Sequence, residues 1–273
     1  MPTTRVNAAT IAYTDTGTPA GKPDAATVLF GHGLLFSGWM FHPQVAALRE
    51  QYRCVTIDWR GQGDTPPTPA GYDMDTLTAD AVALIESLDL APVHYVGLSM
   101  GGFVGLRLAA RHGELLRSLT LLDTSADGES PDHLRQYRLL ASIYRLVGII
   151  GPVRNKVLPL MFGPKFLAEL ASQALITDWT DRLRRCDRGG IRRAVLGVAD
   201  RAPVVDELAR ISVPTLVMVG ADDIATRPEH SVRIAEGVVG ARLEKLESCG
   251  HSSSLERPDA VTKLLGEFLA GID

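Results

Sequence analysis

The sequence predicts an α/β protein, with a mostly parallel sheet, helices on both of its faces and an all-helical insertion. Short apolar runs alternate with segments of helical periodicity through residues 1–124 and again through residues 211–273. Residues 125–210 contain helical patterns and no convincing strand. Polar and glycine-rich loops follow several of the expected strands, as is typical of functional groups at the carboxyl edge of a parallel sheet.

The first half of the chain supplies the alternation. An antiparallel edge hairpin is expected over residues 3–16, where apolar and polar residues alternate weakly. The further strands expected here cover 27–30, 54–58, a run from Val93 that ends before Ser99, and 116–122. Apolar residues at helical intervals predict helices over 39–50, over 77–88 and directly after Ser99.

The second half contains the insertion and the return to the sheet. Within the insertion the expected helices cover 134–150, 166–176, 179–185 and 191–198, separated by glycine and proline. The strands expected after it cover 213–219 and 241–246, and the helices cover 229–237 and 258–269. We therefore divide the chain into a core of residues 1–124 and 211–273 and a helical cap of residues 125–210.

Length, charge and cysteine content restrict the class of protein. The 273 residues suffice for one large domain with a sizeable core. A net charge of −4 argues against nucleic-acid binding and against a basic membrane-surface role. Three scattered cysteines are typical of reduced thiols rather than of a disulfide framework or a zinc site. With no leader-like or membrane-spanning apolar run, we expect a cytoplasmic protein.

The stretch Gly97-Leu98-Ser99-Met100-Gly101 predicts a sharp turn between a strand and a helix. A serine at such an apex is exposed at the positive end of the helix, where backbone N–H groups point. The pentapeptide alone is weak evidence, since chance produces it in roughly one such chain in eight. A structural or phosphate-binding turn is the alternative, but the stretch has neither the dinucleotide-binding glycine spacing nor the Gly-Lys-Ser/Thr of a phosphate loop.

Three further strand ends carry residues with related chemistry. His32 and Gly33 follow the strand at 27–30, Asp222 and Asp223 follow the strand at 213–219, and His251 lies in the loop after the last strand. Serine, aspartate and histidine thus occur in the chain order of a serine hydrolase built on a parallel sheet. Because independent segments must each place the right residue, coincidence is a much weaker explanation here than for the pentapeptide.

These stretches resemble motifs of the α/β-hydrolase superfamily along nearly the whole chain, and particularly the 3-oxoadipate enol-lactonase and carboxylesterase-like branch. The matching stretches are Gly97-Leu98-Ser99-Met100-Gly101-Gly102, His32-Gly33, Asp58-Trp59-Arg60-Gly61-Gln62-Gly63, Val219-Gly220-Ala221-Asp222-Asp223 and Gly250-His251. Gln62 departs from the pattern, since histidine is common there. The resemblance implies the α/β-hydrolase fold with a cap, but it does not identify a substrate.

Each residue of the expected catalytic triad has a role and an alternative. Ser99 is the expected nucleophile, and His251, whose imidazole titrates near neutral pH, is the expected base. The resemblance places the acid at Asp223 in preference to Asp222. Asp123 is a third carboxylate at a strand end, with a loop-capping role as its expected function.

The remaining site residues concern the oxyanion, the substrate and the surface charge. The backbone N–H groups of Leu34 and Met100 are expected to bind the oxyanion, and His32 to shape that loop. Six apolar residues are either core or the lining of a substrate pocket: Trp39, Met40, Phe41, Leu160, Met161 and Phe162. The arginines at 182, 184, 185, 188, 192 and 193 are either a solvated helix face or a means of steering carboxylate-bearing substrates.

The sequence thus predicts a serine hydrolase that cleaves carboxylic esters or lactones through an acyl-enzyme. A carbon–carbon bond hydrolase, a perhydrolase and an acyltransferase would keep the same triad, and a small-molecule receptor with little turnover is an alternative from another class. We expect no cofactor and no metal site, since the histidines lack metal-ligand spacing. The expected partner is a small ester or lactone, with no nucleic acid and no membrane, and a homo-oligomer is left open.

Overall fold

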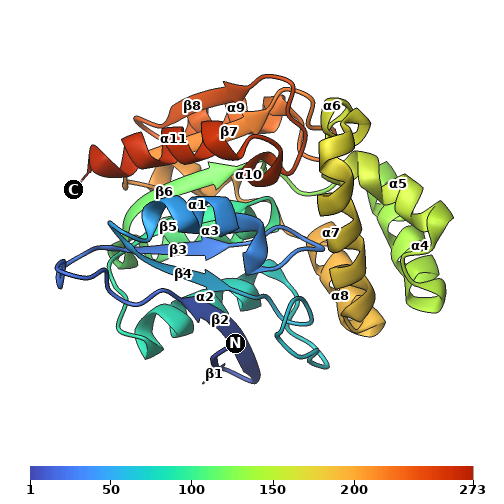
Figure 1. The fold of residues 1–273 in the computed structure, drawn as a ribbon, viewed down its shortest axis with the longest axis horizontal. Helices are drawn as coiled ribbons and strands as arrows, with labels where there is room; N and C mark the ends of the chain where they lie inside the picture. Colours follow the sequence, from blue (N-terminus) through green and yellow to red (C-terminus); the bar gives the residue numbers. More distant parts are fainter. Residues whose placement is uncertain (273) are drawn as a thin grey trace.

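The computed structural model describes residues 1–272 and contains one eight-stranded sheet (Figure 1). The sheet has the order β1-β2-β4-β3-β5-β6-β7-β8, in which β1 and β2 are antiparallel to their neighbours and the rest are parallel. The strands are β1 (Thr3–Val6), β2 (Ala9–Asp15), β3 (Thr27–Gly31), β4 (Arg53–Ile57), β5 (Val93–Leu98), β6 (Leu116–Leu122), β7 (Thr215–Gly220) and β8 (Arg242–Leu246). The predicted mostly parallel sheet is confirmed.

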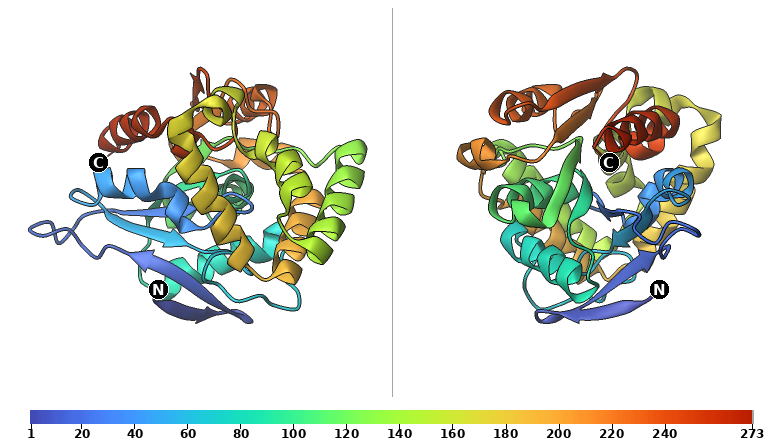
Figure 2. Two further views of the ribbon diagram at one scale, coloured as in Figure 1. Left: turned by 45° about the vertical axis from the view of Figure 1, so that its right-hand side comes forward. Right: turned by 90° about the vertical axis from the view of Figure 1, so that its left-hand side faces the viewer.

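Helices cover both faces of this sheet (Figure 2). On one face α1 (His42–Leu48) packs against α11 (Pro258–Ala270), with α10 (Ser253–Glu256) beside them. The other face carries α2 (Met74–Ser87), α3 (Met100–Arg111) and α9 (Pro228–Gly237). Short 3₁₀ helices are η1 (Gly38–Phe41), η2 (Gly113–Leu115), η3 (Leu170–Ser172) and η4 (Val205–Arg210). Within residues 1–272 no helix combines the length and the apolar character needed to cross a membrane.

Side-chain alternation in the central strands explains the two layers. In β3, Leu29 belongs to the apolar cluster under α2 and α3, whereas Val28 and Phe30 belong to the cluster under α1 and α11. All three side chains are fully buried. A strand that is covered on both faces needs apolar residues at every position, which is why these strands appear as continuous apolar runs in the sequence.

Five α-helices lie between β6 and β7 and form the cap at one end of the sheet (Figure 1). They are α4 (Pro131–Val147), α5 (Gly151–Met161), α6 (Pro164–Ala168), α7 (Gln173–Arg185) and α8 (Arg188–Ala199). Helix α5 was not expected, because Gly151-Pro152 and Pro159 indicate interruptions. Pro152 instead occupies the first turn, where no N–H is needed, and Pro159 lies near the carboxyl end. Helix α7 is continuous where we expected a break at residues 177–178.

The two stems of the cap meet where they leave the sheet. The N–H of Val204 donates to the carbonyl of Ala126 at 2.8 Å, and Nε of Arg201 donates to the carbonyl of Asp127 at 3.1 Å. Helix η4, which lies within the range expected for the cap, packs against α3 and α9 of the core. Residues 205–210 thus contact helices of the core, and the boundary at residue 211 stays a prediction.

The turn between β5 and α3 depends on close backbone contact. A methyl group on Gly97 would collide with the carbonyl of Gly101, and one on Gly101 would collide with the carbonyl of Gly31. These obstacles are backbone atoms, so they cannot move aside as a flexible side chain can. The glycines thus allow α3 to begin directly against β3 and β5, with Ser99 at the turn.

This contact predicts opposite effects for the same substitution at two helical glycines. Gly101→Ala is expected to lower the free energy of unfolding by about 3 kcal/mol or more, the upper end for overpacking, because the obstacle is backbone. Gly266→Ala in α11 meets nothing within 4 Å and is expected to raise it by about 0.8–1 kcal/mol through helix propensity. Urea denaturation of both variants measures the two changes. Equal effects at the two positions would contradict the close-contact explanation.

Candidate active site

Ser99 lies at the apex of the turn between β5 and α3 in a strained backbone conformation. Its φ of 51° and ψ of −111° are rare for a residue with a side chain. Three hydrogen bonds hold its backbone in place: its N–H donates to the carbonyl of Leu122 at 2.9 Å, and its carbonyl accepts the Thr124 hydroxyl and the Phe103 N–H, both at 2.9 Å. The strain directs the Ser99 hydroxyl away from the sheet toward the loops that follow β7 and β8.

The structure brings Ser99, His251 and Asp223 into one chain of hydrogen bonds. Nε2 of His251 lies 2.9 Å from Oγ of Ser99, and Nδ1 of His251 lies 2.8 Å from Oδ2 of Asp223. All three residues are at most 6% exposed. Asp222, the alternative acid, is exposed to solvent. The geometry therefore brings together the three residues expected as a triad and places Asp223, rather than Asp222, against His251.

The carboxylate of Asp223 is fixed by its own loop. Oδ1 accepts the N–H groups of Ala225 and Thr226 at 2.8 and 3.0 Å, and Oδ2 accepts the Thr226 hydroxyl at 2.8 Å. Burial lowers the pKa of His251, but the charge and hydrogen bond of Asp223 outweigh burial and leave that pKa above its ordinary value. Asp223 thus orients the imidazole and favours its protonated form.

Two further buried carboxyl groups hold the acid and histidine loops. Asp123 accepts the N–H of Gly220 at 2.8 Å through one oxygen and that of Ser253 at 3.2 Å through the other. It has the loop-capping role expected from the sequence. Its own burial, together with nearby Asp223, raises the pKa of Asp123 above the ordinary range. The carboxyl group therefore connects the loop that carries Asp223 to the loop that carries His251.

Glu256 supports the histidine loop from the other side and joins it to the cap. Its Oε2 accepts the N–H groups of Gly163 and Gly250 at 3.0 and 2.9 Å, and its Oε1 accepts that of Ser252 at 3.1 Å. Burial raises the pKa of Glu256. The sequence did not identify this role. Its one signal was a glutamate five residues after His251, which is too common a pattern to be read as an anchor.

The loop after β3 is held by the turn after β4. The backbone N–H of Trp59 donates to Nε2 of His32 at 3.0 Å, so Nδ1 carries the ring proton and donates it to the carbonyl of Gly33 at 2.7 Å. Gln62, the residue that departs from the family pattern, accepts the N–H of Leu35 at 2.8 Å through Oε1. His32 thus shapes the loop, as expected, and Gln62 secures its far end.

The expected oxyanion donors flank the serine. Met100 begins α3 directly after Ser99, and Leu34 lies between Gly33 and the Gln62-bound Leu35. Within residues 1–272 neither backbone N–H donates to a protein acceptor. Leu34 and Ser99 line the same cavity. Both amides are therefore available to an oxygen atom that develops negative charge beside Ser99.

Comparison with known proteins identifies the family. The model of the alpha/beta hydrolase family matches residues 28–264. The chain belongs to the alpha/beta hydrolase family. A Mycobacterium tuberculosis relative with the provisional name non-heme bromoperoxidase BpoC is 30% identical over 272 residues, which cover 96% of this chain and 98% of the relative.

Solved structures of similar proteins agree with this assignment. The enol-lactonase from Burkholderia xenovorans LB400 has a TM-score of 0.89 and 29% identity, and the match covers 98% of this hydrolase and all of that chain. A thermophilic esterase from Thermogutta terrifontis has a TM-score of 0.87 and 28% identity, over 97% of this chain and 94% of the other. The fold class and the resemblance to the enol-lactonase branch are thereby confirmed.

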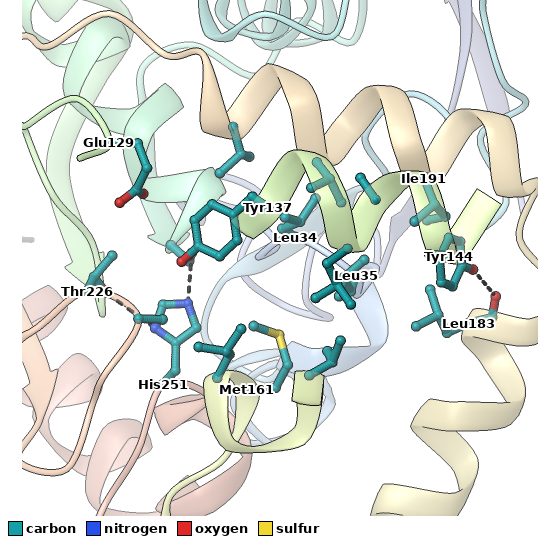
Figure 3. A pocket seen from close by; sticks show the side chains of 18 of the residues that line it. Leu34, Leu35, Glu129, Tyr137, Tyr144, Met161, Leu183, Ile191, Thr226 and His251 are labelled. Atoms are coloured by element: carbon teal, nitrogen blue, oxygen red, sulfur yellow. Dashed lines mark hydrogen bonds between the residues drawn. The ribbon is translucent and has the colours of Figure 1, made fainter. Parts of the chain in front are cut away.

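A cavity in this hydrolase extends from Ser99 and His251 into the cap (Figure 3). Of the six residues considered for its lining, Leu160 and Met161 line it. The other four do not line it: three are buried in the packed interior, and Trp39 is half-buried against it. Met40 and Phe41 are fully buried, Phe162 packs against Phe36 and Trp179, and Trp39 packs between Phe36 and Arg182. For all six residues the sequence left core and pocket lining open as alternatives.

Polar residues of the cap enter the same cavity and were missed. Glu129 and Tyr137 come from the start of the cap, and Arg201 from its end. Burial, with the charge of Glu129, raises the pKa of Tyr137 to about 12, so its phenol stays protonated at neutral pH. In the sequence these residues lie in a segment with helical periodicity but no recognisable motif. Nothing there marked them as site residues.

The buried contacts of His32 predict that its ring does not titrate near neutral pH. Burial lowers the pKa of His32 from 6.5 to about 3. NMR of the ring nitrogens between pH 8 and pH 5 is expected to show constant His32 shifts, with free imidazole as internal reference. A titration midpoint near 6.5 would contradict this.

The lowered pKa of His32 also determines how the stability of the fold depends on pH. The unfolded chain binds a proton at His32 near pH 6.5, and the folded chain does so only near pH 3. The contribution of His32 to the free energy of unfolding is therefore complete above pH 6.5. It decreases by up to about 1.4 kcal/mol per pH unit as the pH falls from 6.5 toward 3.

Proposed function

We propose that this hydrolase cleaves carboxylic esters or lactones through an acyl-enzyme on Ser99. The observation that carries the proposal is the hydrogen-bond chain from Ser99 through His251 to Asp223, which opens into an apolar cavity. Such a chain converts a weak hydroxyl nucleophile into a reactive one, because the base accepts the proton as the new bond forms. The names of the enol-lactonase and esterase neighbours support the same reaction class.

Acylation follows from the positions of the groups. Oγ of Ser99 attacks the carbonyl carbon, and its proton passes to Nε2 of His251, 2.9 Å away. The carbonyl oxygen becomes an oxyanion and accepts hydrogen bonds from the N–H groups of Leu34 and Met100. As the tetrahedral intermediate collapses, the carbon–oxygen bond of the ester breaks, and His251 gives its proton to the departing alcohol.

Deacylation repeats these steps with water. His251 accepts a proton from water, the resulting hydroxide attacks the acyl carbon, and Oγ of Ser99 leaves with the proton that His251 returns. In a lactone the alcohol remains attached to the acyl chain, so one product is released instead of two. Throughout, Asp223 balances the charge of the imidazolium. No step in this sequence requires a metal or a cofactor.

The bromoperoxidase name of one relative favours perhydrolysis as a second candidate. Hydrogen peroxide in place of water would attack the same acyl-enzyme, which yields a peracid and free Ser99. Carbon–carbon bond cleavage differs from ester hydrolysis only in the bond that breaks. Acyl transfer differs from it only in the group that accepts the acyl chain. Assays with one ester, with and without peroxide or an added alcohol, distinguish hydrolysis, perhydrolysis and acyl transfer by their products, and carbon–carbon bond cleavage needs a separate substrate.

Removal of the nucleophile gives the first test. Ser99→Ala is expected to lower kcat for p-nitrophenyl butyrate by about 10³–10⁶-fold, because no acyl-enzyme forms. A fluorophosphonate probe is expected to label the wild type on Ser99, with loss of fluoride, and to leave the variant unlabelled. Circular dichroism melting serves as the folding control. Wild-type turnover in a folded Ser99→Ala protein would exclude the mechanism.

Adjacent aspartates give a matched pair for the acid. Asp223→Asn is expected to lower kcat by about 10⁴-fold, since it no longer holds the productive tautomer of His251. It should also shift the acidic limb of kcat/KM to lower pH, because Asp223 raises the pKa of His251. Asp222→Asn makes the same change on an exposed side chain and is expected to stay within twofold of wild type. The reverse ranking would assign the acid to Asp222.

A further inference from the structure

The cavity beside the triad is apolar over most of its length. Its walls come from α4, α5 and α8, with Leu140, Tyr144, Val153, Val157, Ile191 and Val195 among the lining residues (Figure 3). Away from the triad, the hydroxyl of Tyr144 donates to the carbonyl of Leu183 at 3.2 Å, which leaves the ring to form the wall. A chain that enters from Ser99 therefore meets hydrocarbon.

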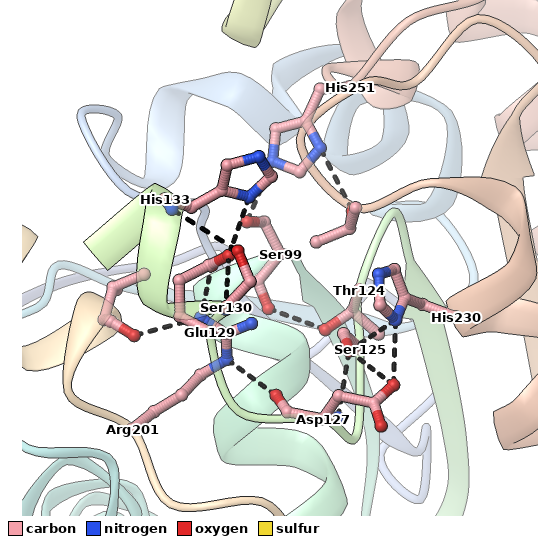
Figure 4. A network of polar contacts seen from close by, with 12 residues as sticks. Ser99, Thr124, Ser125, Asp127, Glu129, Ser130, His133, Arg201, His230 and His251 are labelled. Atoms are coloured by element: carbon pink, nitrogen blue, oxygen red, sulfur yellow. Dashed lines mark hydrogen bonds and ion pairs between the residues drawn. The ribbon is translucent and has the colours of Figure 1, made fainter. Parts of the chain in front are cut away.

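Only two charged residues other than His251 line this cavity within the described part of the chain, and they pair with each other. Nη1 of Arg201 lies 3.1 Å from Oε2 of Glu129, and the two side chains are 5% and 10% exposed. Ser99 lines the same cavity, and Figure 4 shows all three residues. A buried cation beside the cavity would attract an anionic group of the substrate. Here the cation, Arg201, is already paired with the carboxylate of Glu129.

Arg201 also donates to two backbone carbonyls. Nε donates to the carbonyl of Asp127 at 3.1 Å, and Nη1 donates to the carbonyl of Val198 at 3.0 Å. The guanidinium carbon lies 4.3 Å from the centre of the Phe103 ring. Arg201 is therefore held against the cavity wall independently of Glu129.

Glu129 is held in place by the first turn of the cap. Its Oε1 lies 3.0 Å from Nδ1 of His133 and accepts the N–H of Ser130 at 3.2 Å (Figure 4). With Oε2 on Arg201, both oxygens have partners. The carboxylate is thus a fixed part of the wall and is not free to move aside for a substrate carboxylate.

We propose that Glu129 is a specificity-determining residue that cancels the charge of Arg201 and reserves the cavity for neutral, apolar acyl chains. Esters whose chain ends in a carboxylate are rejected, because that group loses its water in the cavity and the charge of Arg201 is already balanced by Glu129. This inference rests on the proposed esterase or lactonase function. It adds the substrate class and names the residue that sets it.

The arginine cluster on the cap does not replace the missing cation. Nε of Arg182 pairs with Asp178 at 2.6 Å, and Nη1 of Arg184 pairs with Asp181 at 2.7 Å. None of the arginines in this cluster lines the cavity. These contacts support the reading as a solvated helix face rather than as a steering surface for anionic substrates.

Two esters of equal chain length test the proposal: p-nitrophenyl hexanoate and the mono-p-nitrophenyl ester of adipic acid, which adds a terminal carboxylate. The measured quantity is the ratio of kcat/KM for the neutral ester to that for the anionic one. Wild type is expected to give a ratio of at least about 100, from the cost of burying an unpaired carboxylate. Glu129→Gln leaves Arg201 without its counter-charge and is expected to lower the ratio about 10- to 100-fold.

Asp132→Asn provides the matched control, since it removes one negative charge from an exposed position in the first turn of α4, three residues from Glu129. Its ratio is expected to stay within twofold of wild type. A wild-type ratio near one overturns the proposal without any variant, and an unchanged ratio in folded Glu129→Gln does so too. Failure of the proposed function has a different signature, namely no turnover of either ester, or turnover that survives Ser99→Ala.

Discussion

Close backbone contact between β3, β5 and the start of α3 is the constraint on which the site depends. Because Gly97 and Gly101 lack side chains, the helix begins against the sheet, and Ser99 is left at the turn with a positive φ. Residues that follow neighbouring strands are also in left-handed conformations, namely Leu35, Asp123 and Ser248. The carboxyl edge thus accepts backbone strain at several strand ends, and the hydrogen bonds across that edge stabilise it.

The hydrogen bonds across this edge are made largely by carboxyl groups that perform no chemistry. Asp123 spans the acid and histidine loops, and Glu256 spans the histidine loop and the cap. Each accepts backbone N–H groups that burial would otherwise leave without partners. The position of His251 relative to Ser99 is therefore fixed by buried hydrogen bonds from several directions, which is what catalysis by orientation requires.

Much of the core and of the candidate triad could be predicted because their signals are local. Apolar runs that contain a closing glycine identify β5 and β7, and Ser99 and Asp223 lie one and three residues after these strands. His251 lies in the loop after β8, whose sequence is mostly polar. The cap gave weaker signals. Pro152 and Pro159 suggested breaks where α5 is continuous, and Met40 and Phe41 have the spacing of buried residues without an indication of which surface covers them. Contacts such as that between Glu129 and Arg201 join residues 72 positions apart, so no local pattern contains them.

The meeting of the two cap stems has a consequence for how such a protein changes over generations. Since Ala126 and Val204 share a hydrogen bond, the chain leaves the sheet and returns to it at one point. A segment inserted between them therefore has ends that lie close together, and the entropic cost of closing a loop grows only slowly with its length. Insertions, deletions or an entire borrowed segment can therefore be accommodated there while the catalytic edge keeps its shape, so new substrates become accessible without rebuilding the chemistry.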